Sequence, residues 1–175
     1  MSNSMARLPN GPSSTAERAR GIAAAGGFEA ALAAGMFDAP LSMPMAEALV
    51  LGLMRQGIRK FLAIFGHGST AIADVLRLYE AHGLLRTFQF RHETAMAHAA
   101  TALRWIYCEP SAVVTSIGPG ALQAMAGSLV AASNGVGVYH LYGDETTHGE
   151  GYSMQAIPQP RQGLYARLSD MHDCG

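Results

Sequence analysis

"SAVVTSIGPGALQAMAGSLVAASNG", residues 111–135, holds the pattern that decides the fold. It begins with a short apolar run that has no polar alternation, passes through Gly118, Pro119 and Gly120, and continues with helical composition. Apolar runs of this kind are typical of strands that helices cover on both faces. The stretch therefore predicts a buried strand, a tight turn and a helix.

The same alternation continues on both sides of this stretch. Apolar runs at 61–66, 87–90 and 136–143 are expected to be further buried strands, with helical windows before and between them. In the first window, 45–57, the row of Met45, Leu49 and Leu53, with Val50 and Met54 beside it, predicts the buried face. Strand and helix in alternation predict an α/β fold, a parallel sheet flanked by helices on both faces.

Length and composition favour one main domain. The chain has 175 residues, and 49% of them are hydrophobic, which is enough for one sizeable core. Residues 1–40 are expected to be an N-terminal extension, partly disordered and partly helical, because its first part is rich in Ser, Pro, Gly and Asn. Residues 41–175 are expected to be the main domain.

Charge and motif content exclude several classes of function. The formal net charge is −1 and the chain has a single lysine, Lys60, so it shows no basic surface for nucleic acid or for an anionic membrane. Two cysteines make no disulfide framework, and neither a targeting segment nor a membrane span is recognisable. We expect a cytoplasmic protein that binds small molecules or protein partners.

Unusual residues follow each predicted strand. They are "GHGST" at 66–70, "RHE" at 91–93, "GPG" at 118–120 and "GDETTHGEG" at 143–151. In open parallel sheets, ligands bind beyond the carboxyl ends of the strands. The four loops therefore predict a binding site at one edge of the sheet, and His67 is a candidate ligand contact within it.

Glu93 allows two interpretations. An acidic residue in the first turn of a helix interacts favourably with the helix dipole, which is an ordinary structural role. However, the helix that follows is rich in alanine, so the carboxylate could be partly desolvated and suited to hydrogen bonding or proton transfer. Both interpretations stay open at the level of residue pattern.

Three familiar motifs are absent. A Gly-x-Ser-x-Gly turn around Ser116 would need glycine where Val114 stands, and a Gly-x-Gly-x-x-Gly fingerprint would need it at Gln123. A zinc HExxH motif would need a second histidine where Met96 stands. We therefore expect no metal ligands in this chain.

The order and spacing of the motifs nevertheless resemble a known family. "RHE" before a small-residue helix, then "TSIGPGALQAMAGSLVAA", a strand ending in "GD" and a loop with "MQ" resemble the pyrimidine-binding (PYR) domain of thiamine diphosphate enzymes of the acetolactate synthase and pyruvate oxidase group. "FGHG", "SIGPGAL" and "GDE" are most similar to the trihydroxycyclohexane-1,2-dione hydrolase branch. The resemblance spans about residues 45–170.

The resemblance implies roles for particular residues. Glu93 would hydrogen-bond N1′ of the aminopyrimidine of thiamine diphosphate and favour the tautomer that removes the thiazolium C2 proton. Gly118, Pro119 and Gly120 would close around the aminopyrimidine, while His67 and Gln155 would border a small carbonyl substrate. The implied function is cleavage or formation of a C–C bond next to a carbonyl.

The chain also departs from the family pattern. It lacks the Gly-Asp-Gly and Asn motif that holds Mg²⁺ and the diphosphate, and the last helix and strand of the domain are not evident. A partner subunit or domain is therefore expected to bind Mg²⁺ and the diphosphate, in a hetero-oligomer or a homodimer. The alternatives are ring-opening hydrolysis of a cyclic diketone, a non-catalytic scaffold or regulatory homologue, and a flavodoxin-like nucleotide binder.

Overall fold

A computed structural model of the protein describes residues 14–143. The strands are β1 Lys60–Ala63, β2 Arg86–Gln89, β3 Ser111–Thr115 and β4 Tyr139–Tyr142. The helices are α1 Thr15–Ala24, α2 Phe28–Ala33, α3 Met45–Arg55, α4 Thr70–Ala81, α5 Glu93–Tyr107 and α6 Pro119–Ser133, with a 3-10 helix, η1, at His67–Ser69. The predictions for the first 13 residues and for everything after residue 143 lie outside the described residues.

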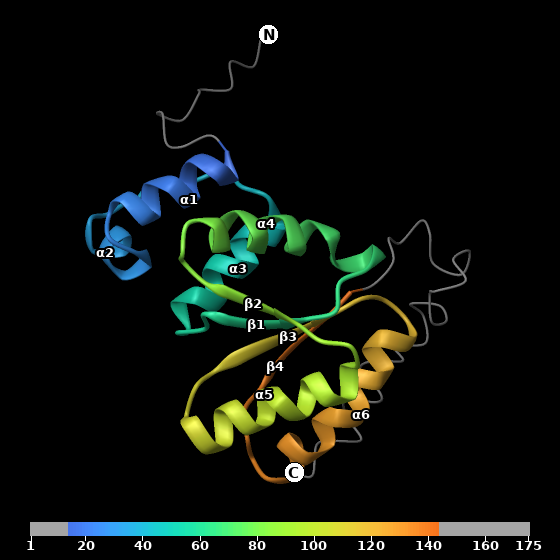
Figure 1. Cartoon of the computed structure of the whole chain (residues 1–175). Coiled ribbons are helices and arrows are strands. Elements are labelled where there is room, and N and C mark those ends of the chain that lie inside the picture. The colour runs from blue at the N-terminus through green and yellow to red at the C-terminus, as the bar shows by residue number, and fades with distance from the viewer. Residues whose placement is uncertain (1–13, 144–175) are drawn as a thin grey trace, which may run out of the picture.

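The four described strands form one parallel sheet in the order β2-β1-β3-β4. Helices α3 and α4 cover one face, with α1 and α2 beyond them, and α5 and α6 cover the other (Figure 1). Both crossovers through α4 and α5 connect parallel strands, as the alternating pattern predicts. The predicted parallel α/β sheet with helices on both faces is confirmed.

Strand burial follows position in the sheet. The central strands β1 and β3 are almost entirely buried, because each has a neighbouring strand on both sides and helices on both faces. The prediction of a buried strand at 87–90 was wrong, since β2 lies at the sheet edge and three of its four residues are exposed. The aromatic residues of that run made an edge strand look like a central one.

Helix α3 buries only part of the face that the sequence predicts. Leu53, Val50 and Met54 are buried, as predicted, whereas Met45 is 84% exposed and Leu49 is 38% exposed. The reason is Glu47, whose side chain is also fully buried and lies on the same face as Val50 and Met54. A hydrophobicity pattern assigns a glutamate to the exposed side of a helix, so it gives no sign that this one is buried.

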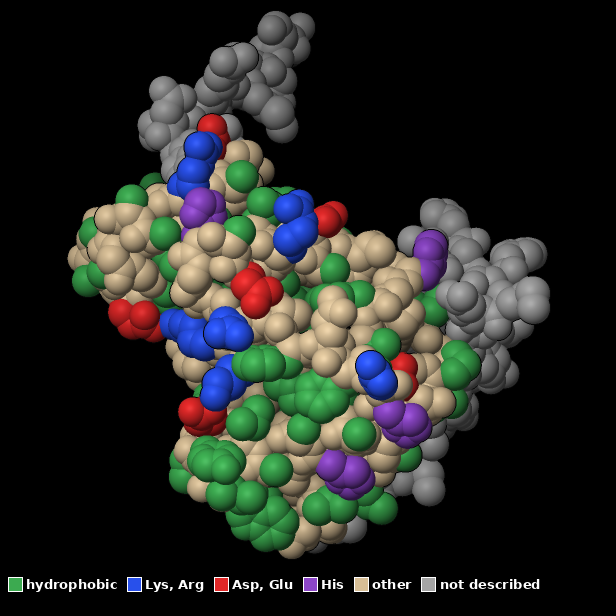
Figure 2. Space-filling view, viewed as in Figure 1, with side chains coloured by type: hydrophobic (Ala, Val, Ile, Leu, Met, Phe, Trp, Pro, Cys, Tyr) green, Lys and Arg blue, Asp and Glu red, His purple; other side chains and the backbone are tan. Residues whose placement is uncertain are grey.

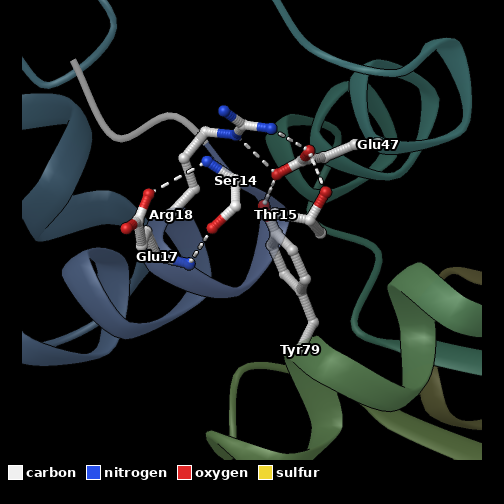
Figure 3. A network of polar contacts seen from close by, with 6 residues as sticks. All are labelled: Ser14, Thr15, Glu17, Arg18, Glu47 and Tyr79. Atoms are coloured by element: carbon white, nitrogen blue, oxygen red, sulfur yellow. Dashed lines mark hydrogen bonds and ion pairs between the residues drawn. The ribbon is translucent and has the colours of Figure 1, made fainter. Parts of the chain in front are cut away.

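Glu47 is the centre of a polar network that joins three helices (Figure 3). Arg18 donates from Nε to Oε1 at 2.8 Å and from Nη2 to Oε2 at 2.5 Å. The Thr15 hydroxyl donates to Oε2 at 2.7 Å, and the Tyr79 hydroxyl donates to Oε1 at 2.9 Å. A buried carboxylate with this many donors has its desolvation cost offset.

The network shifts the ionisation of its members. Burial raises the pKa of the Glu47 carboxyl, but the hydrogen bonds from its three donors and the charge of Arg18 outweigh burial and hold that pKa below its ordinary value. Burial raises the pKa of the Tyr79 hydroxyl, and the hydrogen bond to Glu47 raises it further. Glu47 therefore stays charged at neutral pH and fastens α1 to the helices of the sheet.

Helices α1 and α2 contribute to the same core as the sheet. Ala19, Ile22 and Phe28 belong to one buried cluster with Phe61 of β1 and Val114 of β3. The N-terminal segment from residue 14 therefore packs into the helix layer on the α3 and α4 side. The predicted boundary between extension and main domain near residue 40 stays a prediction.

Candidate functional site

The carboxyl ends of the strands are hydrogen-bonded to one another. The Ile64 amide donates to the Val114 carbonyl at 3.0 Å, and the Gly143 amide donates to the Thr115 carbonyl at 3.3 Å. The Phe90 amide, just after β2, donates to a carbonyl at the end of β1 at 3.2 Å. The loops that follow β1, β2 and β3 therefore leave the sheet at one edge, as the sequence predicts, and Gly143 after β4 lies at the same edge.

Glu93 begins α5 directly after the loop that follows β2. His92 precedes it in an extended conformation, with φ −154° and ψ 128°, and no side chain caps the helix. In the described part of the chain the Glu93 carboxylate accepts no hydrogen bond, and the side chain is partly buried. Its place in the first turn suits the helix dipole, but its carboxylate is also left available to a ligand.

The start of α5 is held firmly by α6. A Cβ added at Gly127 would lie 2.8 Å from the Ala97 Cβ and 2.8 Å from the Thr94 carbonyl oxygen, so the two helix backbones approach closely. The Thr94 hydroxyl also donates to the Gln123 carbonyl at 2.8 Å. The small residues expected to allow close approach therefore fix the position of Glu93, which precedes Thr94.

Gly120 faces the Glu93 carboxylate. A Cβ at Gly120 would lie 3.1 Å from Glu93 Oε1, and 3.9 Å from the Cβ of Ser116. Gly118 adopts φ 64°, which favours glycine, and Pro119 occupies the first turn of α6, where its missing amide hydrogen costs nothing. The predicted Gly-Pro-Gly turn thus presents bare backbone to a partly exposed carboxylate.

The loop after β1 lies on the other side of Ser116. A Cβ at Gly66 would lie 2.2 Å from Ser116 Oγ, so Gly66 has no room for a side chain. His67 follows in η1 with its side chain exposed, and Gly68 is closely approached by Gly143, whose added Cβ would lie 2.9 Å from the Gly68 carbonyl carbon. Three loops therefore meet around Ser116, which the sequence analysis did not select as a site residue.

The predicted site residues can now be placed. The structure brings Glu93 and Gly120 together, with Gly118 and Pro119 in the same turn, and puts His67 on the adjoining loop. Gln155 lies outside the described residues. Among residues 14–143 no group of three or more His, Cys, Asp and Glu side chains could hold a metal ion, and no helix is long and apolar enough to cross a membrane.

An apolar surface lies beside the site helices. Trp105, Ile106 and Tyr107, at the end of α5, are 56%, 69% and 67% exposed. Hydrophobic side chains gather over this end of the helix and continue toward β2 (Figure 2). There they border a groove of about 510 Å³ between β2 and α5, lined mainly by apolar side chains that include Phe88 and Leu103.

Comparison with known families agrees with this geometry. The family model "Thiamine pyrophosphate enzyme, N-terminal TPP binding domain" matches residues 43–170, which is most of the chain. The chain belongs to this family. The suspected PYR-type domain is thereby confirmed, and the edge that carries Glu93 and Gly120 lies within the matched residues of this TPP-binding domain.

One curated relative supports the same assignment. The TPP-binding domain is 30% identical over 107 residues to the acetolactate synthase isozyme 3 large subunit of Escherichia coli (strain K12). The match covers 61% of this chain but only 18% of the relative. The chain therefore matches only a small part of the length of this relative.

Proposed function

We propose that this TPP-binding domain is the pyrimidine-binding component of a thiamine diphosphate-dependent enzyme, which cleaves or forms a C–C bond next to a carbonyl. The observation that carries the proposal is the Glu93 carboxylate at the start of α5, which accepts no hydrogen bond from residues 14–143 and faces the Gly120 backbone. The similarity to an acetolactate synthase large subunit supports the reaction class.

Glu93 would accept a hydrogen bond from the protonated ring nitrogen N1′ of the aminopyrimidine. The carboxylate is partly shielded from water, and α6 holds the helix that carries it, so its position relative to Gly120 is preorganised. Gly118, Pro119 and Gly120 would pack against the ring with backbone alone. When bound, thiamine diphosphate supplies the carbon nucleophile and electron sink for the carbonyl chemistry.

The substrate would be a small carbonyl compound approaching from the β1 side. His67 has an exposed side chain on the loop after β1, next to the glycine that contacts Ser116. A second substrate contact, Gln155, is proposed on the resemblance alone. Both residues would orient the substrate rather than activate the cofactor.

A partner would supply the diphosphate and Mg²⁺ site. The Gly-Asp-Gly motif with a downstream Asn is missing from the sequence, and the chain spans 18% of the relative that it matches. The exposed apolar end of α5 and the adjacent groove are suited to burial against another domain or subunit. We propose a hetero-oligomer or a homodimer in which catalysis needs both domains.

The test is exchange of the C2 proton of thiamine diphosphate in a reconstituted complex. This complex is the full chain mixed with a protein that supplies the diphosphate-binding domain, with thiamine diphosphate and Mg²⁺ added. Glu93→Gln keeps the size of the side chain but removes the charge, and it should slow exchange by about 10² to 10⁴. NMR detection of deuterium incorporation at C2 measures the rate.

Glu109→Gln is the matched control, because Glu109 lies just beyond the other end of α5 and pairs with Lys60. This variant should exchange at the wild-type rate. Equal rates for Glu93→Gln and wild type would refute the role of Glu93, and a wild-type complex without exchange or turnover would favour a non-catalytic scaffold.

A second reaction is favoured by particular motifs. "FGHG" at 65–68 and "SIGPGAL" at 116–122 are most similar to the branch that opens the ring of a cyclic diketone. This reading keeps the same cofactor role for Glu93 and changes the substrate and product. Product analysis with 1,2-cyclohexanedione and with pyruvate distinguishes the two. Addition of water across the C–C bond between the two carbonyls gives an open chain with a carboxylate at one end and an aldehyde at the other, whereas pyruvate gives a decarboxylated or condensed product.

A further inference from the structure

Ser116 occupies the junction of the candidate site. Its Oγ lies 2.2 Å and its Cβ 2.6 Å from the position that a Cβ of Gly66 would take. The serine side chain therefore fills the space beside the bare backbone of the loop after β1. Because Gly66 has φ −167°, an ordinary extended conformation, the glycine is required here by contact with Ser116 and not by its backbone angle.

Ser116 also lies next to the proposed catalytic carboxylate. Its Cβ is 3.9 Å from the Cβ position of Gly120, and Glu93 Oε1 is 3.1 Å from that same position. Serine and glutamate thus approach one glycine from two different loops. Ser116 is on the side of the loop that carries His67, which is the side proposed to border the substrate.

The backbone of Ser116 accepts a hydrogen bond, whereas its hydroxyl has no partner among the described residues. The buried Thr115 donates its hydroxyl to the Ser116 carbonyl at 3.0 Å. Within residues 14–143 the Ser116 hydroxyl makes no hydrogen bond, and the side chain is partly exposed. A hydroxyl can donate one hydrogen bond and accept others, so a free one at this position can bind a polar ligand atom.

We propose that Ser116 is a substrate-binding residue, whose hydroxyl donates a hydrogen bond to an oxygen of the carbonyl substrate beside Glu93. This inference rests on the proposed function and adds a residue to it. The Ser116 Oγ lies toward Gly66, which precedes His67, and the Ser116 Cβ lies toward Gly120. An oxygen bound to the hydroxyl would therefore lie on the His67 side of the ring that Glu93 would hold. Carbonyl and carboxylate oxygens are suitable acceptors.

The test compares Ser116→Ala with wild type in the reconstituted complex. The probe is oxamate, an unreactive analogue of a 2-oxo acid, and its dissociation constant is measured by titration calorimetry. Loss of one hydrogen bond should weaken oxamate binding by about tenfold. The rate of C2 proton exchange should stay at the wild-type value, because Ser116 acts on substrate and Glu93 acts on the cofactor.

Ser133→Ala is the matched control, since Ser133 lies at the far end of α6 and bonds only within that helix in the described structure. It should bind oxamate as wild type does. The inference is overturned if Ser116→Ala and wild type bind oxamate equally well, or if wild type does not bind it. In either case, normal exchange of the C2 proton leaves the proposed function standing. Slowed exchange in Ser116→Ala would assign the serine to the cofactor and also overturn it. Absence of exchange in wild type overturns the proposed function itself.

Discussion

Two glutamates, Glu47 and Glu93, have opposite surroundings in this molecule. Glu47 is fully buried between helices and accepts hydrogen bonds from Thr15, Arg18 and Tyr79 (Figure 3). Glu93 lies at the carboxyl edge of the sheet, partly exposed, and faces backbone at Gly120 without a hydrogen bond from the described residues. The difference separates a carboxylate used for folding from one available for binding.

The contrast has a physical basis in desolvation. A carboxylate removed from water needs donors from the protein, and Glu47 obtains them from three side chains. Glu93 keeps contact with solvent. A ligand that donates a hydrogen bond to its carboxylate would replace water molecules there, at little cost in free energy. A glutamate whose carboxylate accepts hydrogen bonds from several protein side chains can therefore be assigned a structural role. A glutamate whose carboxylate accepts none and lies beside bare backbone is the better site candidate.

The largest effect on stability should come from breaking the Glu47 network. Arg18→Met leaves a buried carboxylate without its charged partner, which should lower the free energy of unfolding by about 3 to 5 kcal/mol. Arg20→Met, on the exposed side of the same helix, should change it by less than about 0.5 kcal/mol. Urea unfolding followed by circular dichroism measures both, and similar losses in the two variants would contradict the structural role of Glu47.

A smaller effect should follow from filling the space beside Ser116. Gly66→Ala places a methyl group 2.2 Å from Ser116 Oγ and should lower the free energy of unfolding by about 1 to 3 kcal/mol. Gly66→Ala combined with Ser116→Gly removes the clash and should regain most of this loss. Gly137→Ala is the control, because nothing lies within 4 Å of its added Cβ. Absence of recovery in the double variant would show that Ser116 is not the obstacle.

The last of these predictions concerns how stability depends on pH. The pKa of Glu47 is lowered in the folded protein, so its contribution to stability is complete above the unfolded-state value of about 4.3. That contribution is lost as the pH falls through the lower folded-state pKa. Urea unfolding of wild type and Glu47→Gln between about pH 3 and pH 7 should show curves that differ at neutral pH and converge in acid. A constant difference across this range would contradict the shift.

The repeating pattern was enough to predict the parallel sheet and to place the candidate site residues at one of its edges. Apolar runs such as 111–117 are long enough and bounded clearly enough to identify strands, and parallel topology then brings their following loops together. The Gly-Pro-Gly turn and Glu93 could therefore be placed at one edge without knowledge of any contact. The contact between Glu93 and Gly120 is consistent with that placement.

Contacts between distant residues could not be predicted in this way. Arg18 and Glu47 are 29 positions apart, and a glutamate in a helix is normally assigned to the exposed face, which is why the burial of Glu47 in α3 was not predicted. Strand order also depends on topology, so the apolar run of β2 gave no sign that it was an edge. Gly66 and Ser116 meet only because β1 and β3 are neighbours.

The central claim is that Glu93 serves the cofactor and Glu47 serves the fold. The most direct test is the rate of C2 proton exchange in reconstituted complexes containing Glu93→Gln or Glu47→Gln, measured at a temperature where both variants are folded. We predict that Glu93→Gln exchanges about 10² to 10⁴ times more slowly than wild type, while Glu47→Gln exchanges at the wild-type rate. Equal rates in the two variants, or slower exchange in Glu47→Gln, would contradict the account.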